Sequence, residues 1–312
     1  MHILSHITMV TTCAAFATAG PVLWDGRARF NLTGADLNSN VGPFLTVVKG
    51  SENASHYSSL LGPTLAPTPL WAPRSGHLEQ PVSISIDNTS VFAPGGGAPQ
   101  LGFRRTEFIA ANNGDHADLI PVIEGGKTAF HFSLRADTKR PLNLTHEYQV
   151  VFIEPNDGSH VFEVQLGSPY TNPTGTLPSA DAHEIKLRDH ALDLLFAAPF
   201  TPGAWHNFAV QVDWTNRTLA VLYSADAAPL RVVTPPSPNL SAQLGADGQG
   251  DFHFGVLKLP LVDPNDTPTE QGDVVHFGIQ EGTTEALIYS GVFVENASHS
   301  ISLGYGLTIP SL

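Results

Sequence analysis

The chain has 312 residues, of which only 14% are Asp, Glu, Lys or Arg, and its formal net charge is −14. Ordinary globular proteins contain about 25% charged residues. The sequence has no run of Lys and Arg, which argues against a nucleic-acid partner, and its acidic balance is compatible with neutral ligands such as sugars.

The N-terminus predicts a secretory leader. The first 19 residues contain no Asp, Glu, Lys or Arg and run apolar and small to Ala17-Thr18-Ala19. This A-x-A pattern predicts a signal peptide over residues 1–19 that is removed before Gly20. A membrane anchor is the alternative, but the apolar run is short and is broken by Ser, Thr and His. The only cysteine, Cys13, lies in this leader, so we expect a mature chain without disulfides.

Glycosylation sequons agree with export. Eight Asn-x-Ser/Thr sequons occur along the chain, at Asn31, Asn53, Asn88, Asn143, Asn216, Asn239, Asn265 and Asn296. Such sequons are acceptors for N-glycans in secreted proteins. We therefore expect a secreted, extracellular glycoprotein without a membrane-spanning segment, with residues 20–312 forming one domain that acts as a monomer.

Short alternating runs dominate the rest of the chain. In chain order they cover residues 82–86, 103–109, 129–134, 148–152, 160–164, 208–212, 219–223, 252–256 and 290–294. The best helical pattern, around residues 182–198, is weak. Many short strands separated by Gly, Pro and Asn turns predict an all-β fold, an antiparallel β-sandwich of the jelly-roll type.

Residues that alternate along a strand point to opposite faces of a sheet, so the pattern also predicts which side chains share a face. Several strands have one apolar face, which a sandwich buries, and one polar face, which we expect to form a concave groove. In EYQVVF the alternation places Phe152 on the apolar face and Val151 on the polar one. The candidates for the polar groove are Arg105, Glu107, His131, Arg135, Glu147, Gln149, Glu163, Gln165 and Trp205.

Two positioned carboxylates are the usual equipment for cleaving a glycosidic bond. Glu107 and Glu147 are the candidates for that pair, and the alternative is that Arg105 and Arg135 neutralise them as structural ion pairs. Trp205 could stack on a sugar ring. The sequence has no zinc-binding spacing, phosphate-binding loop or nucleophile elbow, so we expect no metal and no cofactor.

Eight segments, in order, resemble the catalytic domain of glycoside hydrolase family 131. The members of this family are secreted fungal β-glucanases. The matching segments are Val22-Leu23-Trp24-Asp25-Gly26, Val41-Gly42-Pro43-Phe44, Lys49-Gly50-Ser51-Glu52 with Ser55-His56-Tyr57, Arg104-Arg105-Thr106-Glu107, Glu147-Tyr148-Gln149, Trp205-His206-Asn207-Phe208-Ala209, His253-Phe254-Gly255-Val256-Leu257 and Ser290-Gly291-Val292-Phe293-Val294-Glu295. They span nearly all of the mature chain. Two stretches depart from the family pattern, Phe152 to Gly158 and Gly95 to Phe103.

The resemblance implies a single jelly roll that hydrolyses β-1,3, β-1,6 and β-1,4 glucans with inversion at the anomeric carbon. It also implies that Glu107 and Glu147 are the catalytic carboxylates, about 6.5–9.5 Å apart, as inversion requires. The sequence leaves open which is acid and which is base, although a nearby Arg105 would keep Glu107 ionised and favour the base role. Arg105, His131, Arg135, Gln149, Glu163 and Trp205 would bind the sugar. The alternative function is a lectin-like, glucan-binding relative that does not cleave.

Overall fold

The computed structural model of the protein describes residues 18–62, 64–71, 79–95, 97–170 and 176–312. The predicted leader, including Cys13, therefore lies almost wholly outside the described residues.

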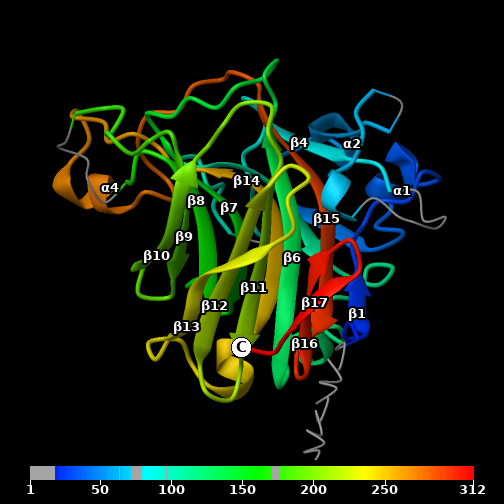
Figure 1. Ribbon diagram of the computed structural model, residues 1–312. Coiled ribbons are helices and arrows are strands. Elements are labelled where there is room, and N and C mark those ends of the chain that lie inside the picture. The colour runs from blue at the N-terminus through cyan, green and yellow to red at the C-terminus, as the bar shows by residue number, and fades with distance from the viewer. Residues whose placement is uncertain (1–17, 63, 72–78, 96, 171–175) are drawn as a thin grey trace, which may run out of the picture.

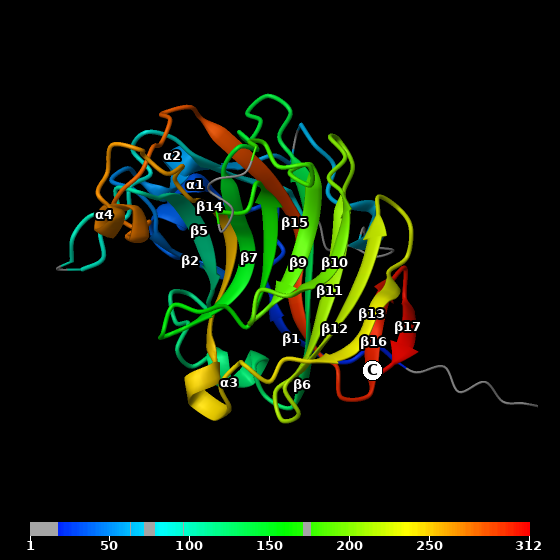
Figure 2. The ribbon, with the colours of Figure 1, turned by 90° about the vertical axis from the view of Figure 1, so that its left-hand side faces the viewer.

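Two antiparallel sheets form the two layers of a jelly-roll sandwich (Figures 1 and 2). The first sheet contains, in spatial order, β13 (Arg231–Pro238), β12 (Thr218–Ala225), β11 (His206–Asp213), β6 (Lys127–Ala136), β15 (Glu285–Asn296), β4 (Val82–Ile86) and β3 (Ser58–Leu60), with β1 (Val22–Asp25) also paired to β15. The second sheet contains β10 (Leu194–Pro199), β9 (Glu184–Asp189), β8 (Phe162–Gly167), β7 (Glu147–Pro155), β14 (Gly250–Lys258), β5 (Arg104–Ala110) and β2 (Phe44–Val48). A separate hairpin joins β16 (Ser300–Gly304) to β17 (Leu307–Pro310).

The helices of the described residues are short and lie in the connections. They are α1 (Gly34–Asn38), α2 (Ala54–Tyr57), α3 (Ile120–Ile123), α4 (Pro268–Gly272) and the 3-10 turns Pro69–Trp71 and Gly245–Gly248. Figures 1 and 2 both show α1 beside α2. Within the described ranges, no helix has the length and apolar character that a membrane span requires.

Aromatic side chains from both sheets form the core between them. Phe130 of β6 packs against Phe252 of β14, with ring centroids 4.9 Å apart, and against Phe162 of β8 at 6.0 Å. Phe254 of β14 likewise meets Tyr289 of β15 at 5.5 Å. These rings are fully buried, and burial of apolar surface is the main stabilising term for a chain with no disulfide in its described part.

The predicted strands are confirmed, but the weak helical prediction around residues 182–198 is wrong. This segment forms β9 and β10, which pair with each other. The alternation in β9 explains the difference, because Ile185 and Leu187 enter the core while Lys186 and Arg188 point away from it.

A β-bulge in β7 also corrects the predicted faces of that strand. The pairing of β7 with β8 shifts between Gln149 and Val151, and Val150 and Val151 are both buried in the core. A bulge adds one residue to one strand and reverses the alternation beyond it. Phe152 therefore lies on the polar face, where the uninterrupted alternation had placed Val151.

Candidate active site

The side of the second sheet that faces away from the core carries a dense set of polar side chains, which we call the carboxylate face. Its members come from five neighbouring strands and are Arg105, Glu107, Glu147, Gln149, Glu154, Glu163, Gln165, Lys186, Arg188 and His253. Most of them are buried in spite of their charge. Buried charges require partners, so their pairing decides what this face can do.

Glu107 lies at the centre of the first group of charges. Arg105, two residues away on β5, donates from Nε to one carboxylate oxygen at 2.9 Å and from Nη2 to the other at 2.7 Å. His253 Nδ1 lies 2.9 Å from the second oxygen. Burial alone would raise the pKa of Glu107, but the charge of Arg105 and the hydrogen bond from His253 outweigh it and lower the pKa to about 2. Glu107 is therefore a permanent anion, and its carboxylate has no exposed surface.

Arg188 connects two carboxylates in a second group. Its Nη2 lies 2.6 Å from Glu147 Oε1, and its Nε donates to Glu163 Oε1 at 2.8 Å. His160 Nδ1 lies 2.7 Å from the other oxygen of Glu163. Burial tends to raise the pKa of Glu163, but His160 and Arg188 together lower it. Glu147 also accepts hydrogen bonds from Gln149 Nε2 and from the backbone N–H of Tyr170.

Phe152 links the two groups. Its ring stacks between those of His160 and His253, at centroid distances of 4.1 and 4.8 Å. The β7 bulge makes this stack possible, because it turns Phe152 outward. Apolar side chains of Phe103, Tyr170 and Val274 border the same face near Phe152. The carboxylate face is thus a line of charged and aromatic groups.

The strand register gives the separation of the two candidate glutamates. Glu107 pairs with Gly255 of β14, and the carbonyl of Glu147 accepts the N–H of Leu259, four residues further along. Their backbones are thus offset by about 13 Å along the strands and about 10 Å across them. The side chains must lean toward each other to reach the spacing of an inverting pair. That carboxyl spacing, and the concave groove over this face, stay predictions.

The structure brings Arg105, Glu107, Glu147, Gln149 and Glu163 together, as expected from the alternation.

Three predicted sugar-binding residues lie elsewhere, because β6 and β11 belong to the first sheet. His131 is fully buried, bonded to Glu295 at 2.9 Å and stacked on Phe293. Arg135 lies over the ring of Trp205, and Trp205 is only 4% exposed, so it offers no stacking platform. The prediction that these three residues share a groove with Glu107 is therefore wrong. Alternation predicts which face of a strand a side chain occupies, but it does not predict to which sheet the strand belongs.

Sequence reasoning missed four members of the carboxylate face, Glu154, Lys186, Arg188 and His253, and also His160, which precedes β8. His253 alternates with two buried phenylalanines in FHF, a signal that the pattern did contain. Arg188 was missed because its segment was interpreted as a helix, so it was not assigned to a face of a strand. Among the described residues, no cluster of three side chains could hold a metal ion.

Comparison with known proteins gives the family of this sandwich. Residues 22–300 match the model of the glycoside hydrolase 131 catalytic N-terminal domain. The chain belongs to this family.

Two solved structures are similar along nearly the whole chain. The β-glucanase catalytic domain of family 131 from Podospora anserina is 26% identical, with a TM-score of 0.66, over 91% of this chain and 99% of that one. The family 131 catalytic domain from Coprinopsis cinerea is 24% identical, with a TM-score of 0.65, over 92% and 99%. No curated relative matches the sequence.

Proposed function

We propose that this glycoside hydrolase cleaves β-glucans on the carboxylate face, with inversion at the anomeric carbon. The observation that carries the proposal is that Glu107, which Arg105 holds as a carboxylate, and Glu147 lie on the same face of the same sheet. The similarity to a β-glucanase domain supports glucan as the substrate class. We extend the proposal to β-1,3, β-1,6 and β-1,4 linkages.

Glu107 and His253 form the base side of this mechanism. A carboxylate can only accept hydrogen bonds, so His253 donates its Nδ1 proton to Glu107 and leaves Nε2 free to accept one. Nε2 faces Glu154 at 3.7 Å, and Glu154 is half-buried, whereas Glu107 is enclosed. We assign the proton of the attacking water to Nε2 of His253, a side chain that is itself only 4% exposed, and the negative charge of Glu107 stabilises the imidazolium that forms.

Glu147 is the acid side. Glu147 and Glu163 share the guanidinium of Arg188, which fixes both side chains on the carboxylate face. Because Arg105 and His253 bind Glu107 on the base side, the acid role is assigned to Glu147, the second carboxylate of the proposed pair. As water attacks the anomeric carbon, the glycosidic bond breaks and Glu147 protonates the leaving oxygen.

One observation favours the second candidate function, glucan binding without cleavage. Glu107 and Glu147 each bind an arginine, which is the pattern expected of structural ion pairs. A binding protein needs hydrogen-bonding and aromatic groups on this face, but it needs no free acid and base.

The decisive experiment measures sugar release from β-1,3-, β-1,6- and β-1,4-glucan by the purified chain from Gly20 onward. Glu107→Gln, Glu147→Gln and His253→Gln are compared with Glu52→Gln, an exposed glutamate, as the matched control. We expect the first three to lose at least 100-fold in rate while staying folded, and Glu52→Gln to retain activity. NMR of the first product shows whether the anomeric configuration inverts. If wild type binds glucan but releases nothing, the binding function replaces hydrolysis.

We also propose that the protein is exported and glycosylated, with residues 20–312 as one catalytic domain. The apolar leader and the eight sequons support this proposal. Expression in a eukaryotic secretory host tests it. Protein that stays in the cell, or that is secreted with residues 1–19 still attached, would contradict it.

A further inference from the structure

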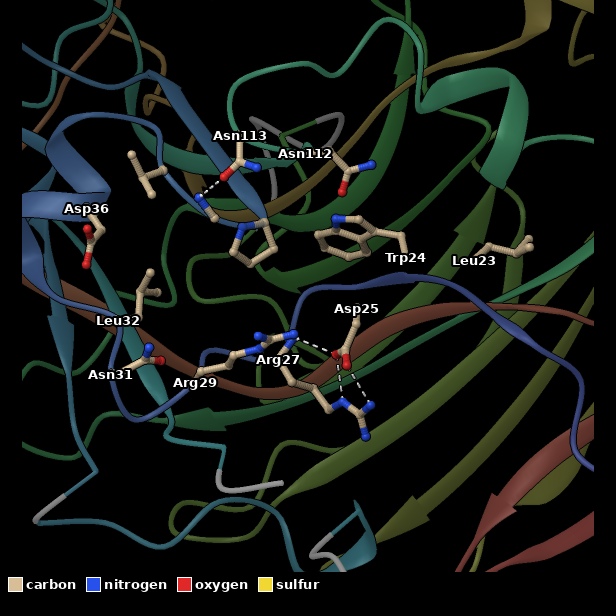
Figure 3. Close-up of a pocket in the computed structure, with 13 residues that line it drawn as sticks. Leu23, Trp24, Asp25, Arg27, Arg29, Asn31, Leu32, Asp36, Asn112 and Asn113 are labelled. Atoms are coloured by element: carbon tan, nitrogen blue, oxygen red, sulfur yellow. Dashed lines mark hydrogen bonds and ion pairs between the residues drawn. The ribbon is translucent and has the colours of Figure 1, made fainter. Parts of the chain in front are cut away.

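A cavity of about 560 Å³ lies beside β1 and away from the carboxylate face (Figure 3). The segments around it are residues 23–36, 41–43 and 112–113. Asn112 and Asn113 follow β5, the strand that carries Glu107, after the single residue Ala111. Asn112 lies five residue steps beyond Glu107, which in extended chain places the cavity about 16 Å from the proposed catalytic site.

Hydrogen bonds and ring contacts order one wall of the cavity. Asp25 accepts two hydrogen bonds from Arg27, at 2.7 and 2.8 Å, and the Arg27 guanidinium lies 5.1 Å above the ring of Phe293. Trp24 donates from Nε1 to the carbonyl of Ala111 at 3.1 Å, so its ring is fixed as well. Preorganised walls reduce the entropy lost when a ligand binds.

Other polar side chains at the cavity are exposed and have no partner among the described residues. Within the part of the chain that the structure describes, the exposed Arg29 guanidinium and the exposed side-chain amide of Asn112 make no hydrogen bond or ion pair. Asn113 uses only its oxygen, which accepts the N–H of Gly42 at 2.9 Å. Figure 3 shows the labelled side chains of Arg29, Asn112 and Asn113 around the same space. These groups offer several donors and acceptors to a ligand.

The charges at the cavity indicate a neutral ligand. The lining contains two arginines, Arg27 and Arg29, and two carboxylates, Asp25 and Asp36, so it has no net charge. Planar amide and guanidinium groups suit pairs of neighbouring hydroxyls, and a cavity of this volume is large enough for a short oligosaccharide.

We propose that this cavity is a second carbohydrate site, which binds a segment of β-glucan remote from the bond being cleaved. The proposal rests on the proposed function, because it takes β-glucan as the substrate. Such a site would hold a long polymer on the enzyme while the carboxylate face acts on another part of it. Linked sites gain affinity because the second contact is intramolecular.

The test is a titration of inactive Glu147→Gln protein with β-glucan hexasaccharides of each linkage. The protein is made in a bacterial host, so that Asn31, which begins a sequon, carries no glycan. Arg29→Ala with Asn112→Ala should weaken one of two binding events about tenfold, since each removes a hydrogen bond. Both side chains are exposed, so the fold should persist. Arg231→Ala, on the edge strand β13, is the matched control and should bind normally.

Hydrogen exchange on the same protein without the cavity substitutions gives an independent readout. We expect glucan to protect residues 24–31 and 112–113 from exchange. Equal binding by the cavity variant and the control, with no protection of these residues, would overturn the second site even if the enzyme hydrolyses glucan. Binding with protection there, in a protein that releases no sugar, would support the second site and reject only the hydrolytic function.

Discussion

Arg105 and Glu107 form a bidentate ion pair between residues two apart on the same strand, β5, and both are buried. Adjacent same-face positions on one strand bring a guanidinium fork and a carboxylate together without any distant contact. The pair is completed by His253 from the neighbouring strand.

Replacing Arg105 with Met should destabilise the protein strongly, because it leaves the buried charge of Glu107 without its main partner. Breaking a buried pair costs about 3–5 kcal/mol, whereas replacing both members with apolar residues is often tolerated. Urea unfolding at pH 7 of Arg105→Met, of Arg105→Met with Glu107→Leu, and of Arg231→Met as the exposed control measures this. A loss below about 1 kcal/mol for Arg105→Met would contradict a stabilising role for the pair.

Glu79 should make stability fall as the pH rises. Burial raises the pKa of Glu79 from 4.5 to about 7, although Gly291 N–H and the Ser290 hydroxyl oppose the rise. Because the folded protein favours the protonated form, this contribution is complete below pH 4.5 and is lost as the pH rises through 7. Between pH 5 and 8 we expect the unfolding free energy of wild type to fall by about 2–3 kcal/mol more than that of Glu79→Gln.

The measurement for Glu79 is urea unfolding at pH 5, 6, 7 and 8 for wild type and variant. Glu107 provides a contrast, since its pKa of about 2 gives stability that is present above pH 4.5 and lost as the pH falls toward 2. Parallel pH curves for wild type and Glu79→Gln between pH 5 and 8 would show that Glu79 does not titrate there.

Gly255→Ala should disturb the candidate site because the added methyl group has no room. A Cβ on Gly255 would lie 2.2 Å from the carbonyl oxygen of Thr106 and 2.6 Å from Glu107 Cα, so β5 and β14 would have to separate. We expect a loss of about 1–3 kcal/mol in unfolding free energy, with reduced sugar release. Gly272→Ala is the matched control, because nothing lies within 4 Å of its Cβ position. Equal melting temperatures for the two variants would contradict this packing.

The structure predicts which sequons carry glycans if the protein is exported. The Asn239 side chain is 3% exposed, accepts the N–H of His190 and donates to the carbonyl of Val161, so the folded chain has no room for a glycan there. Asn53 and Asn88 are exposed and make no side-chain hydrogen bond among the described residues. We expect mass spectrometry of secreted protein to find glycans at Asn53 and Asn88 but none at Asn239. A fully occupied Asn239 would contradict the fold around it.

Much of the fold could be predicted from the sequence, because β-strands have a period of two. The alternation in FHFSLR and HVFEVQL places Phe130, Phe132 and Phe162 in the core, as the structure confirms. Residues 182–198 were harder, since short apolar runs with charged neighbours fit both strand and helix periods. Only packing against β8 decides that Arg188 lies on a strand.

The sequence by itself determined the sandwich class and the common face of Arg105 with Glu107 and of Glu147 with Gln149. Local alternation is enough for that, since it depends only on residues within one strand. The tertiary structure alone decided that His131, Arg135 and Trp205 belong to the opposite sheet, that a bulge turns Phe152 outward, and that Arg188 joins Glu147 to Glu163. These relations depend on which strands become neighbours, and strand order is set by burial and pairing across the whole chain.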